Sequence, residues 1–442
     1  LTDLRIVLVG GLGAGKSTLL SYITHGTKDN GRGSARLNLL RHRHELESGR
    51  SSSISHEIIG YDAEGHLINY ATTHINTWEQ ICEASHKVIT LLDTCGYPKY
   101  LRTTISGLMG YAPDYACLVI AANSAANKST PTIDDMTREH LSIAVMLDVP
   151  VFVVMTKSDV ATHDQLKSTL HLLLNLLKSS LWLKKKVPVV VQNENDVVTY
   201  ASCLGRQGGG SELPIFLVSN VTGSNMNLLQ MFFNYLPKPK RMNYDEQLEE
   251  PAEFQIEEVY RIPDVGVVVG GVLGQGRINV KEKDKKYYLG PNTKGEFTLV
   301  NIISVHRHRV PSHYVHCGQT ATLALQNRSE SEALSSWKIS RGMVLLAAED
   351  DKKPDCYRMF EAELTVVYHA TGVSAGTCGM IHSGSIRQRA KVMSETNAAI
   401  LRTGKKGTCC FSSMYEPCYL KLGSQILFLE GRSKCIGRVT KL

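Results

Sequence analysis

The stretch Gly10–Thr18, GGLGAGKST, decides the fold, and it directly follows the apolar run Leu4–Val9. It matches the phosphate-binding loop pattern G-x-x-x-x-G-K-[ST], in which a glycine-rich turn connects a buried strand to a helix. Backbone N–H groups of such a loop surround the phosphates, the lysine reaches the β- and γ-oxygens, and the next hydroxyl binds Mg²⁺. The residues expected to contact the nucleotide are Gly10, Gly13, Ala14, Gly15, Lys16, Ser17 and Thr18.

Two further polar segments follow apolar, strand-like runs, and together they predict a guanine site. Thr156-Lys157-Ser158-Asp159 follows the run 150–155, and Ser219-Asn220-Val221 follows the run 214–218. The carboxylate of Asp159 can accept hydrogen bonds from both N–H donors on one edge of guanine. The stem of Lys157 can cover the purine plane, and the loop at 219–221 can offer a backbone N–H to the guanine oxygen. Because ligands of open α/β sheets bind beyond the carboxyl ends of the strands, these segments should meet there.

The segment Asp93-Thr94-Cys95-Gly96 follows the apolar run 88–92 and has the D-x-x-G pattern of a switch. In such a motif the aspartate holds Mg²⁺ through a water, and the glycine N–H meets the γ-phosphate. Glycine suits that position because the peptide must turn when the phosphate leaves. The order of the four motifs is that of a GTP-binding switch protein, and the two guanine-type motifs disfavour a P-loop ATPase or kinase. The sequence therefore predicts GTP or GDP, with Mg²⁺, as the ligands.

These motifs resemble those of the translational GTPases of the elongation factor Tu superfamily. Within it the chain resembles the eukaryotic GTP-binding protein 1/2 group, on the long first switch within Asp29–Ser53. The run Ser52–Ile58 favours the GTP-binding protein 2 branch. The resemblance implies ribosome-coupled GTP hydrolysis, with the ribosome and a tRNA or a tRNA-mimicking rescue factor as partners. The cargo stays open, and the alternative is a GTP-sensing module that hydrolyses GTP slowly or not at all.

The catalytic candidates, Gly96 and Tyr97, include a departure from that family. Tyr97 stands where translational GTPases have the histidine that positions the attacking water, and Pro98 favours an extended backbone at Tyr97. A phenol with a pKa of about 10 is a poor base at neutral pH. The sequence therefore predicts intact nucleotide binding and slow hydrolysis.

The expected metal ligands are Ser17, Ser53 and, through a water, Asp93. Ser53 is expected to replace the switch threonine that binds Mg²⁺ in the family, and Ser51 is the alternative alignment. Gly13 and Thr156 also replace residues that the family often has as aspartate and asparagine.

The pattern of apolar residues changes along the chain and predicts three domains. Residues 1–240 alternate short apolar runs with helical stretches, which indicates an α/β P-loop GTPase domain with a mostly parallel sheet and helices on both faces. Alternating runs separated by turn signals then favour antiparallel strands. By the resemblance, these form β-barrel domain II at 250–350 and β-barrel domain III at 355–442.

The formal charge of +7 is concentrated near the C-terminal end. Residues 351–442 hold 14 basic and seven acidic residues, and the rest of the chain holds 35 of each. These basic residues can neutralise RNA phosphates, although an ordinary solvated surface explains them equally well. They include Arg387, Arg389, Lys391, Arg402, Lys405 and Lys406.

Eleven cysteines, an odd number without a C-x-x-C pair, indicate a reducing compartment, and we expect a cytoplasmic location. No apolar run approaches the roughly 20 residues of a membrane span. We expect a monomer with no membrane partner. Because residue 1 is leucine, the natural N-terminus is expected to lie upstream.

Overall fold

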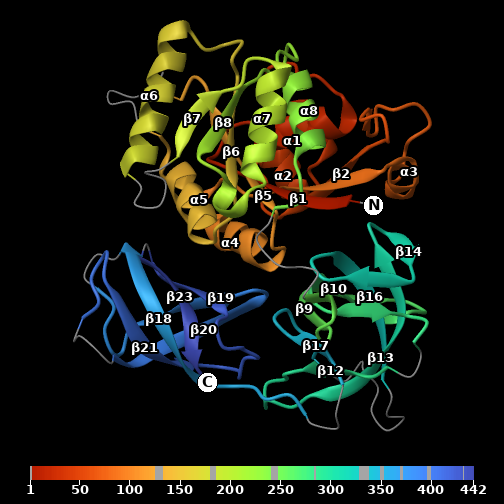
Figure 1. Ribbon diagram of the computed structural model, residues 1–442, viewed down its shortest axis with the longest axis vertical. Coiled ribbons are helices and arrows are strands. Elements are labelled where there is room, and N and C mark those ends of the chain that lie inside the picture. Colours follow the sequence, from red (N-terminus) through yellow and green to blue (C-terminus); the bar gives the residue numbers. More distant parts are fainter. Residues whose placement is uncertain are drawn as a thin grey trace. The chain divides into compact units, whose positions relative to one another are not determined.

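The computed structural model describes residues 2–124, 133–179, 186–239, 247–282, 285–327, 338–348, 353–368, 372–395, 400–431 and 433–442. The chain divides into two compact units, drawn as ribbons in Figure 1. The first comprises Leu1–Leu108 and Ala112–Met242, and the second comprises Asn243–Leu442 with Met109–Tyr111. The expected domain limits at residues 240 and 350 lie outside the described residues.

The first unit contains an eight-stranded sheet in the order β3-β2-β4-β1-β5-β6-β8-β7. β2 pairs antiparallel with β4 and β3, and the remaining neighbours pair parallel. β1 is buried along seven of its eight residues, as expected for a parallel strand covered on both faces. The strands are β1 Thr2–Val9, β2 Ser55–Tyr61, β3 Leu67–Ile68, β4 Lys87–Asp93, β5 Tyr115–Ala121, β6 Val151–Thr156, β7 Val187–Val190 and β8 Glu212–Leu217.

Helices cover both faces of this sheet, as the sequence predicts (Figure 1). Buried residues of α1, α7 and α8 form one core cluster with β1, β5, β6 and β8, whereas α5 contacts β5 and β1. The α-helices are α1 Lys16–His25, α2 Arg43–Ser48, α3 Trp78–Ala84, α4 Leu101–Gly110, α5 Asp135–Met146, α6 His163–Ser179, α7 Glu194–Leu204 and α8 Met226–Tyr235. Short 3₁₀ turns are η1 Ala35–Asn38, η2 Pro98–Tyr100 and η3 Gln207–Gly209.

The second unit begins with a closed antiparallel sheet in the order β12-β17-β9-β10-β16-β13, with β14 added to β13. A separate ribbon consists of β11 and β15. The core of the closed sheet includes Phe254, Leu273 and Leu323, all without exposed surface. The strands are β9 Glu253–Ile262, β10 Gly266–Gln275, β11 Arg277–Asn279, β12 Tyr287–Gly290, β13 Thr298–Arg307, β14 Val310–Ser312, β15 Tyr314–His316, β16 Thr320–Asn327 and β17 Val344–Ala347.

The C-terminal strands of the second unit form another closed antiparallel barrel, in the order β18-β21-β20-β19-β22-β23. Burial alternates along β21, which is the pattern of a strand with one face toward a core. That core includes Phe360, Phe411 and Phe428. The strands are β18 Met359–Tyr368, β19 Cys378–Ser383, β20 Ile386–Glu395, β21 Lys406–Ser413, β22 Gln425–Glu430 and β23 Ser433–Lys441. The predicted fold class, an α/β GTPase domain followed by two β-barrels, is confirmed.

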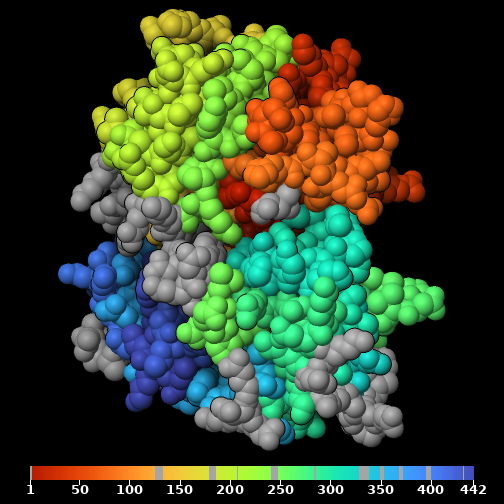
Figure 2. Space-filling model, turned by 45° about the vertical axis from the view of Figure 1, so that its right-hand side comes forward, coloured from red at the N-terminus to blue at the C-terminus, as the bar shows by residue number. Residues whose placement is uncertain are grey.

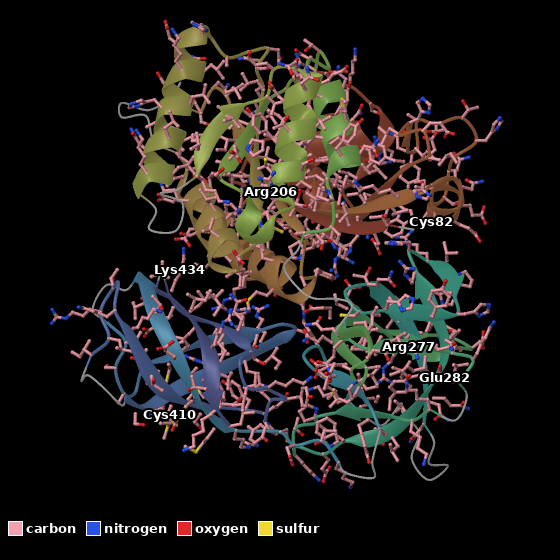
Figure 3. All side chains as sticks on the ribbon, viewed as in Figure 1. Cys82, Arg206, Arg277, Glu282, Cys410 and Lys434 are labelled. Carbon is pink, nitrogen blue, oxygen red and sulfur yellow. The ribbon has the colours of Figure 1, made fainter. Side chains whose placement is uncertain are left out.

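All eleven cysteines are free thiols; Figure 3 labels Cys82 on α3 and Cys410 on β21. Among the described residues, every helix is too short or too polar to cross a bilayer.

Candidate nucleotide-binding site

The glycine-rich loop between β1 and α1 requires glycine at several positions. Gly10, Gly13 and Gly15 have φ values of 143°, 74° and 91°, a region that other residues rarely adopt. A Cβ atom on Gly10 would also lie 2.2 Å from the carbonyl oxygen of Val119. Positive φ values at several glycines are typical of a loop whose backbone can curl round an anion.

Helix α5 fixes the start of this loop. The N–H of Gly10 donates to Nδ1 of His140, and the N–H of Gly11 donates to the hydroxyl of Thr137, each at 3.0 Å. Both partners are more than 120 residues away in the sequence. Sequence reasoning missed them, because no local signal connects α5 with the loop.

Lys16 is buried, with 6% of its surface exposed, and it folds back on its own loop. Its Nζ donates to the carbonyl oxygens of Gly10 and Gly11, both at 2.9 Å. Burial lowers the pKa of Lys16, and the neighbouring carboxylate of Asp93 opposes that shift. A Cβ atom on Gly96 would lie 2.6 Å from the backbone oxygen of Gly11 and 2.5 Å from Nζ, so glycine allows the switch backbone to approach the phosphate loop.

The hydroxyl of Ser17 and the carboxylate of Asp93 form the pair expected of a magnesium site. Ser17 Oγ donates to Asp93 Oδ2 at 2.5 Å and lies 3.1 Å from the hydroxyl of Ser51. Asp93 is 1% exposed, and its other oxygen, Oδ1, has no hydrogen-bond partner. Burial raises the pKa of Asp93, and Lys16 with Ser17 opposes the shift. An unpaired carboxylate oxygen beside two hydroxyls is a donor set that fits Mg²⁺.

Ser53, which the sequence favours as a metal ligand, is not brought to this pair. Its N–H and hydroxyl donate to Glu45 Oε1 at 3.2 and 3.3 Å. Ser51, the alternative, takes the place beside Ser17. The two serines lie two residues apart in a segment without regular periodicity. Which of them faces Ser17 is therefore decided by the hydrogen bonds that hold Ser53 on Glu45.

Glu45 organises the segment between α1 and β2, and we call residues 29–54 the switch segment. Glu45 is 2% exposed, and besides Ser53 it accepts the N–H and hydroxyl of Ser52, both at 2.7 Å. Its second oxygen accepts the N–H groups of Arg41 and His42 at 3.2 Å. Burial alone would raise the pKa of Glu45, but these hydrogen bonds outweigh it and lower the pKa to about 2. In Figure 2 the colour bar gives the switch segment a red to red-orange colour, and atoms of these colours are visible on the surface of the first unit.

The guanine-type motifs contact each other and the phosphate loop. Ser219 Oγ donates to Asp159 Oδ1 at 2.7 Å and accepts the N–H groups of Val221 and Thr222 at 3.2 and 3.1 Å. Thr156 Oγ1 donates to the carbonyl of Ala14 at 2.6 Å, which ties the β6 end to the loop. Asp159 is exposed and free to accept further donors.

Two more residues determine the course of the chain at the guanine-binding end of the site. Lys157 has a positive φ of 60°, which turns the chain sharply after β6. Asn220 is 6% exposed, and its backbone carbonyl oxygen accepts the N–H of Asp29 at 2.9 Å. The base-side loop and the start of the switch segment are thus directly connected.

A cavity of about 230 Å³ lies in front of the phosphate loop. It contains two arginines, Arg36 and Arg50, to which sequence reasoning assigned no role. The Tyr97 backbone is extended, with φ −92° and ψ 133°, as predicted from Pro98, and the Arg50 guanidinium carbon lies 5.1 Å from the Tyr97 ring centroid. The cavity is lined by Leu12, Gly13, Gly15, Lys16, Ser17, Thr18, Arg36, Ser48, Gly49, Arg50, Ser51, Thr94 and Gly96.

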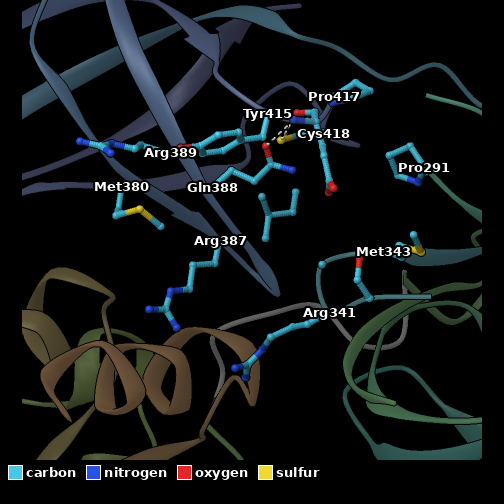
Figure 4. Close-up of a pocket in the computed structure, with 14 residues that line it drawn as sticks. Pro291, Arg341, Met343, Met380, Arg387, Gln388, Arg389, Tyr415, Pro417 and Cys418 are labelled. Carbon is cyan, nitrogen blue, oxygen red and sulfur yellow. Dashed lines mark hydrogen bonds between the residues drawn. The ribbon is translucent and has the colours of Figure 1, made fainter. Parts of the chain in front are cut away.

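A larger cavity, of about 470 Å³, lies in the second unit and contains none of these motif residues (Figure 4). Its lining includes Arg341, Arg387 and Arg389. The Nε of Arg341 already donates to Glu257 at 2.6 Å. Volume therefore does not locate the nucleotide site, which rests on the chemistry of the phosphate loop.

The sequence profile described as the Elongation factor Tu GTP binding domain matches residues 2–238. The chain belongs to this family. It is 42% identical over 442 residues to GTP-binding protein 1 of Xenopus laevis, which covers all of this chain and 63% of that protein. It is 39% identical over 439 residues to GTP-binding protein 2 of Homo sapiens, which covers 99% of this chain and 69% of that protein. The resemblance to the GTP-binding protein 1/2 group is confirmed, although these two identities do not select a branch.

Solved structures of other proteins share this fold. The Ski7 GTPase-like domain of S. cerevisiae, bound to GDP and inorganic phosphate, has a TM-score of 0.70 and 12% identity, and the match covers 99% of this chain and 97% of that one. SelB of Methanococcus maripaludis in complex with the GTP analogue GppNHp has a TM-score of 0.66 and 17% identity, covering 99% and 79%. At these identities the likeness shows the fold alone.

Replacing Asp159 tests the base end of the site. We expect Asp159→Asn to weaken GTP binding by on the order of tenfold to 100-fold, because a charge-assisted pair of hydrogen bonds is lost. The variant should also admit xanthine nucleotides, which present an oxygen where guanine has its amino group. Asp164→Asn, an exposed acid on α6, is the matched control. Equal GTP affinity in Asp159→Asn and the native chain would remove Asp159 from the site.

Replacing Glu45 tests the order of the switch segment. Glu45→Gln loses the charge that its six hydrogen bonds share, so amide hydrogen exchange at residues 50–54 should accelerate by roughly tenfold or more. Because the pKa of Glu45 is lowered from 4.5 to about 2, its contribution to stability is complete above pH 4.5 and is lost as the pH falls toward 2. Glu47→Gln, an exposed carboxylate on the same helix, is the control. Unchanged exchange in Glu45→Gln would contradict this role.

Proposed function

We propose that the chain binds GTP and GDP with Mg²⁺ and hydrolyses GTP slowly, in a switch coupled to the ribosome. The observation that carries the proposal is the gathering of three features at one edge of the sheet. These are the buried lysine of the phosphate loop, the Ser17–Asp93 pair after β1 and β4, and the Asp159–Ser219 pair after β6 and β8. Family membership supports the same conclusion, and solved proteins of this fold hold GDP with phosphate or a GTP analogue.

The metal assignment follows the donors of the site. We propose Ser17 and Ser51 as the hydroxyl ligands and Asp93 as the water-mediated ligand, in place of the set that contains Ser53. Bound there, Mg²⁺ would offset the negative charge of the β- and γ-phosphate oxygens. The loop N–H groups and Lys16 would orient the phosphates, and Gly96 N–H would meet the γ-phosphate.

Family membership and the distribution of basic residues are the grounds on which we propose the partners. We retain the division into a GTP-binding domain at 1–240 and barrels at 250–350 and 355–442, with the barrels presenting a tRNA or a tRNA-mimicking rescue factor to the ribosome. Arg389, Lys391, Arg402, Lys405 and Lys406 are exposed, which suits contacts with RNA phosphates. The eleven free thiols suit a reducing, cytoplasmic compartment, and we propose a monomer.

A GTP-sensing module is the second candidate, and Tyr97 is the observation that favours it. The residue occupies the position of the family's water-positioning histidine, and its phenol is a weak base at neutral pH. In that case binding of GTP changes the switch segment, while turnover stays negligible with or without a ribosome.

Nucleotide binding and turnover distinguish the two candidates. Lys16→Ala should weaken GTP and GDP by on the order of tenfold to 100-fold, since it removes a buried charge from the β- and γ-oxygens. Lys178→Ala, on the exposed end of α6, should bind normally. We expect ribosomes to raise GTP turnover of the native chain by on the order of tenfold to 100-fold. Normal GTP binding by Lys16→Ala would reject the phosphate-loop assignment, and equal turnover with and without ribosomes would reject the coupling.

The basic surface of the last barrel predicts a salt-dependent interaction. Binding to ribosomes or tRNA should weaken steeply as salt rises, because neutralised phosphates release counterions. The double variant Lys405→Glu and Lys406→Glu should weaken that binding further and leave GTP affinity unchanged. Lys167→Glu with Lys178→Glu, exposed lysines of α6, gives the same change in net charge elsewhere. If binding to ribosomes or tRNA does not change with salt, the basic residues are explained by an ordinary solvated surface.

A further inference from the structure

Two arginines of the switch segment line the phosphate cavity, and the four GTPase motifs account for neither. Arg36 and Arg50 share the cavity with Lys16, Ser17 and Ser51. Together with Lys16 they bring three basic residues to the lining of a cavity of about 230 Å³. Such a site suits a triphosphate, which carries more negative charge than a diphosphate.

The two arginines differ in what holds them. The guanidinium of Arg36 lies against the backbone of its own segment, since a Cβ atom on Gly33 or Gly49 would come within 2.9 or 2.6 Å of it. Arg36 therefore supports the turn that follows α2. Arg50 comes directly after that turn, is exposed, and lies over the ring of Tyr97 at 5.1 Å. A guanidinium within about 6 Å of an aromatic face is attracted by the ring quadrupole.

Tyr97 is well placed to hold this guanidinium with its ring. Its extended backbone is followed by Pro98, and the 3₁₀ turn η2 begins there. The Tyr100 ring lies 6.1 Å away. On the other side, the residue after Arg50 is Ser51, whose hydroxyl lies 3.1 Å from that of Ser17. Arg50 thus connects the side chain at the water-positioning site with the metal side of the phosphate cavity.

We propose that Arg50 is a catalytic residue that stabilises the charge on the γ-phosphate during GTP hydrolysis, and that Tyr97 is a positioning residue that holds Arg50 by its aromatic ring. This inference rests on the proposed function and names the group that performs its chemical step. It assigns Tyr97 a role that requires no proton transfer by the phenol.

The chemistry needs no strong base. Water attacks the γ-phosphorus, and the bond from that phosphorus to the β–γ bridging oxygen breaks with its electron pair staying on GDP. The proton released by the water leaves with inorganic phosphate. Because phosphoryl transfer spreads negative charge over the γ- and bridging oxygens, a planar cation with several N–H donors lowers its barrier.

The experiment measures the rate of a single turnover of bound GTP, with and without ribosomes. It compares variants that remove the charge of Arg50, the ring of Tyr97 or the hydroxyl of Tyr97. Arg50→Ala should slow hydrolysis by roughly 100-fold or more, as loss of an arginine at a transferring phosphate does. Arg50→Lys should restore little, since an ammonium cannot reproduce the planar donors. Arg43→Ala, an exposed arginine of α2 paired with Glu47, removes the same charge outside the cavity and should behave as the native chain.

The substitutions at Tyr97 separate the ring from its hydroxyl. Tyr97→Phe keeps the ring and should hydrolyse GTP within about twofold of the native rate. Tyr97→Leu removes the ring and should slow hydrolysis by on the order of tenfold. In the Arg50→Ala background, Tyr97→Leu should add no further loss, because the two residues act as one unit.

Each contrary outcome has a definite meaning. Native turnover in Arg50→Ala, or a loss of GDP affinity equal to its loss of rate, would overturn the catalytic role of Arg50. A rate in Tyr97→Phe as low as in Tyr97→Leu would show that the hydroxyl orients the water and would overturn the positioning role. A native chain that binds GTP without any turnover would also overturn the inference, in favour of the GTP-sensing module. A native chain that fails to bind GTP would instead reject the proposed function itself.

Discussion

The hydrogen bond from Ser17 to the buried carboxylate of Asp93 joins the two strand ends on which the site depends. β1 and β4 are adjacent parallel strands in which Leu8 pairs with Asp93, so the loop after β1 starts beside this carboxylate. Burial disfavours a charged Asp93, and its pKa is raised. Its ionised form therefore depends on Lys16, on Ser17 and on any cation beside its unpaired oxygen. Cation binding and the charge state of Asp93 are consequently linked.

A second carboxylate, Glu45, determines the shape of the switch segment. It gathers six donors from two stretches of that segment, before α2 and after it. This arrangement leaves Ser51 facing Ser17 and holds Ser53 away from it. It also sets the direction of the chain at Arg50, which immediately precedes Ser51. Ser51, which we propose as a metal ligand, and Arg50 are thus positioned by one buried charge that itself lies outside the phosphate cavity.

Much of the fold and of the motif geometry could be predicted from the sequence, for a physical reason. Parallel strands in one sheet end at the same edge, so polar residues after apolar runs must come together, as Ser17 with Asp93 and Asp159 with Ser219 do. The choice of Ser51 over Ser53 could not be predicted, because it depends on side-chain hydrogen bonds to Glu45 in a segment without regular periodicity. The hydrogen bonds from His140 and Thr137 to the phosphate loop could not be predicted from the sequence either. They arise because α5 packs against β1 and β5 and so brings both residues to the loop.

The switch segment connects both ends of the nucleotide site, and this has an energetic consequence. At its start, the N–H of Asp29 donates to the backbone carbonyl of Asn220 in the base-side loop. Near its end, Ser51 lies beside Ser17 and Arg50 lines the phosphate cavity. GDP offers the base contact but no γ-phosphate. In the proposed site the γ-phosphate of GTP would add contacts at only one end of the segment, and only that difference could shift its conformational equilibrium. Each tenfold shift requires about 1.4 kcal/mol of differential binding, which is slightly less than the roughly 1.5–3 kcal/mol that one charge-assisted hydrogen bond contributes. With the roles proposed for Arg50 and Ser51, a few contacts would thus be enough for the segment to respond to the γ-phosphate, while the base end would hold either nucleotide.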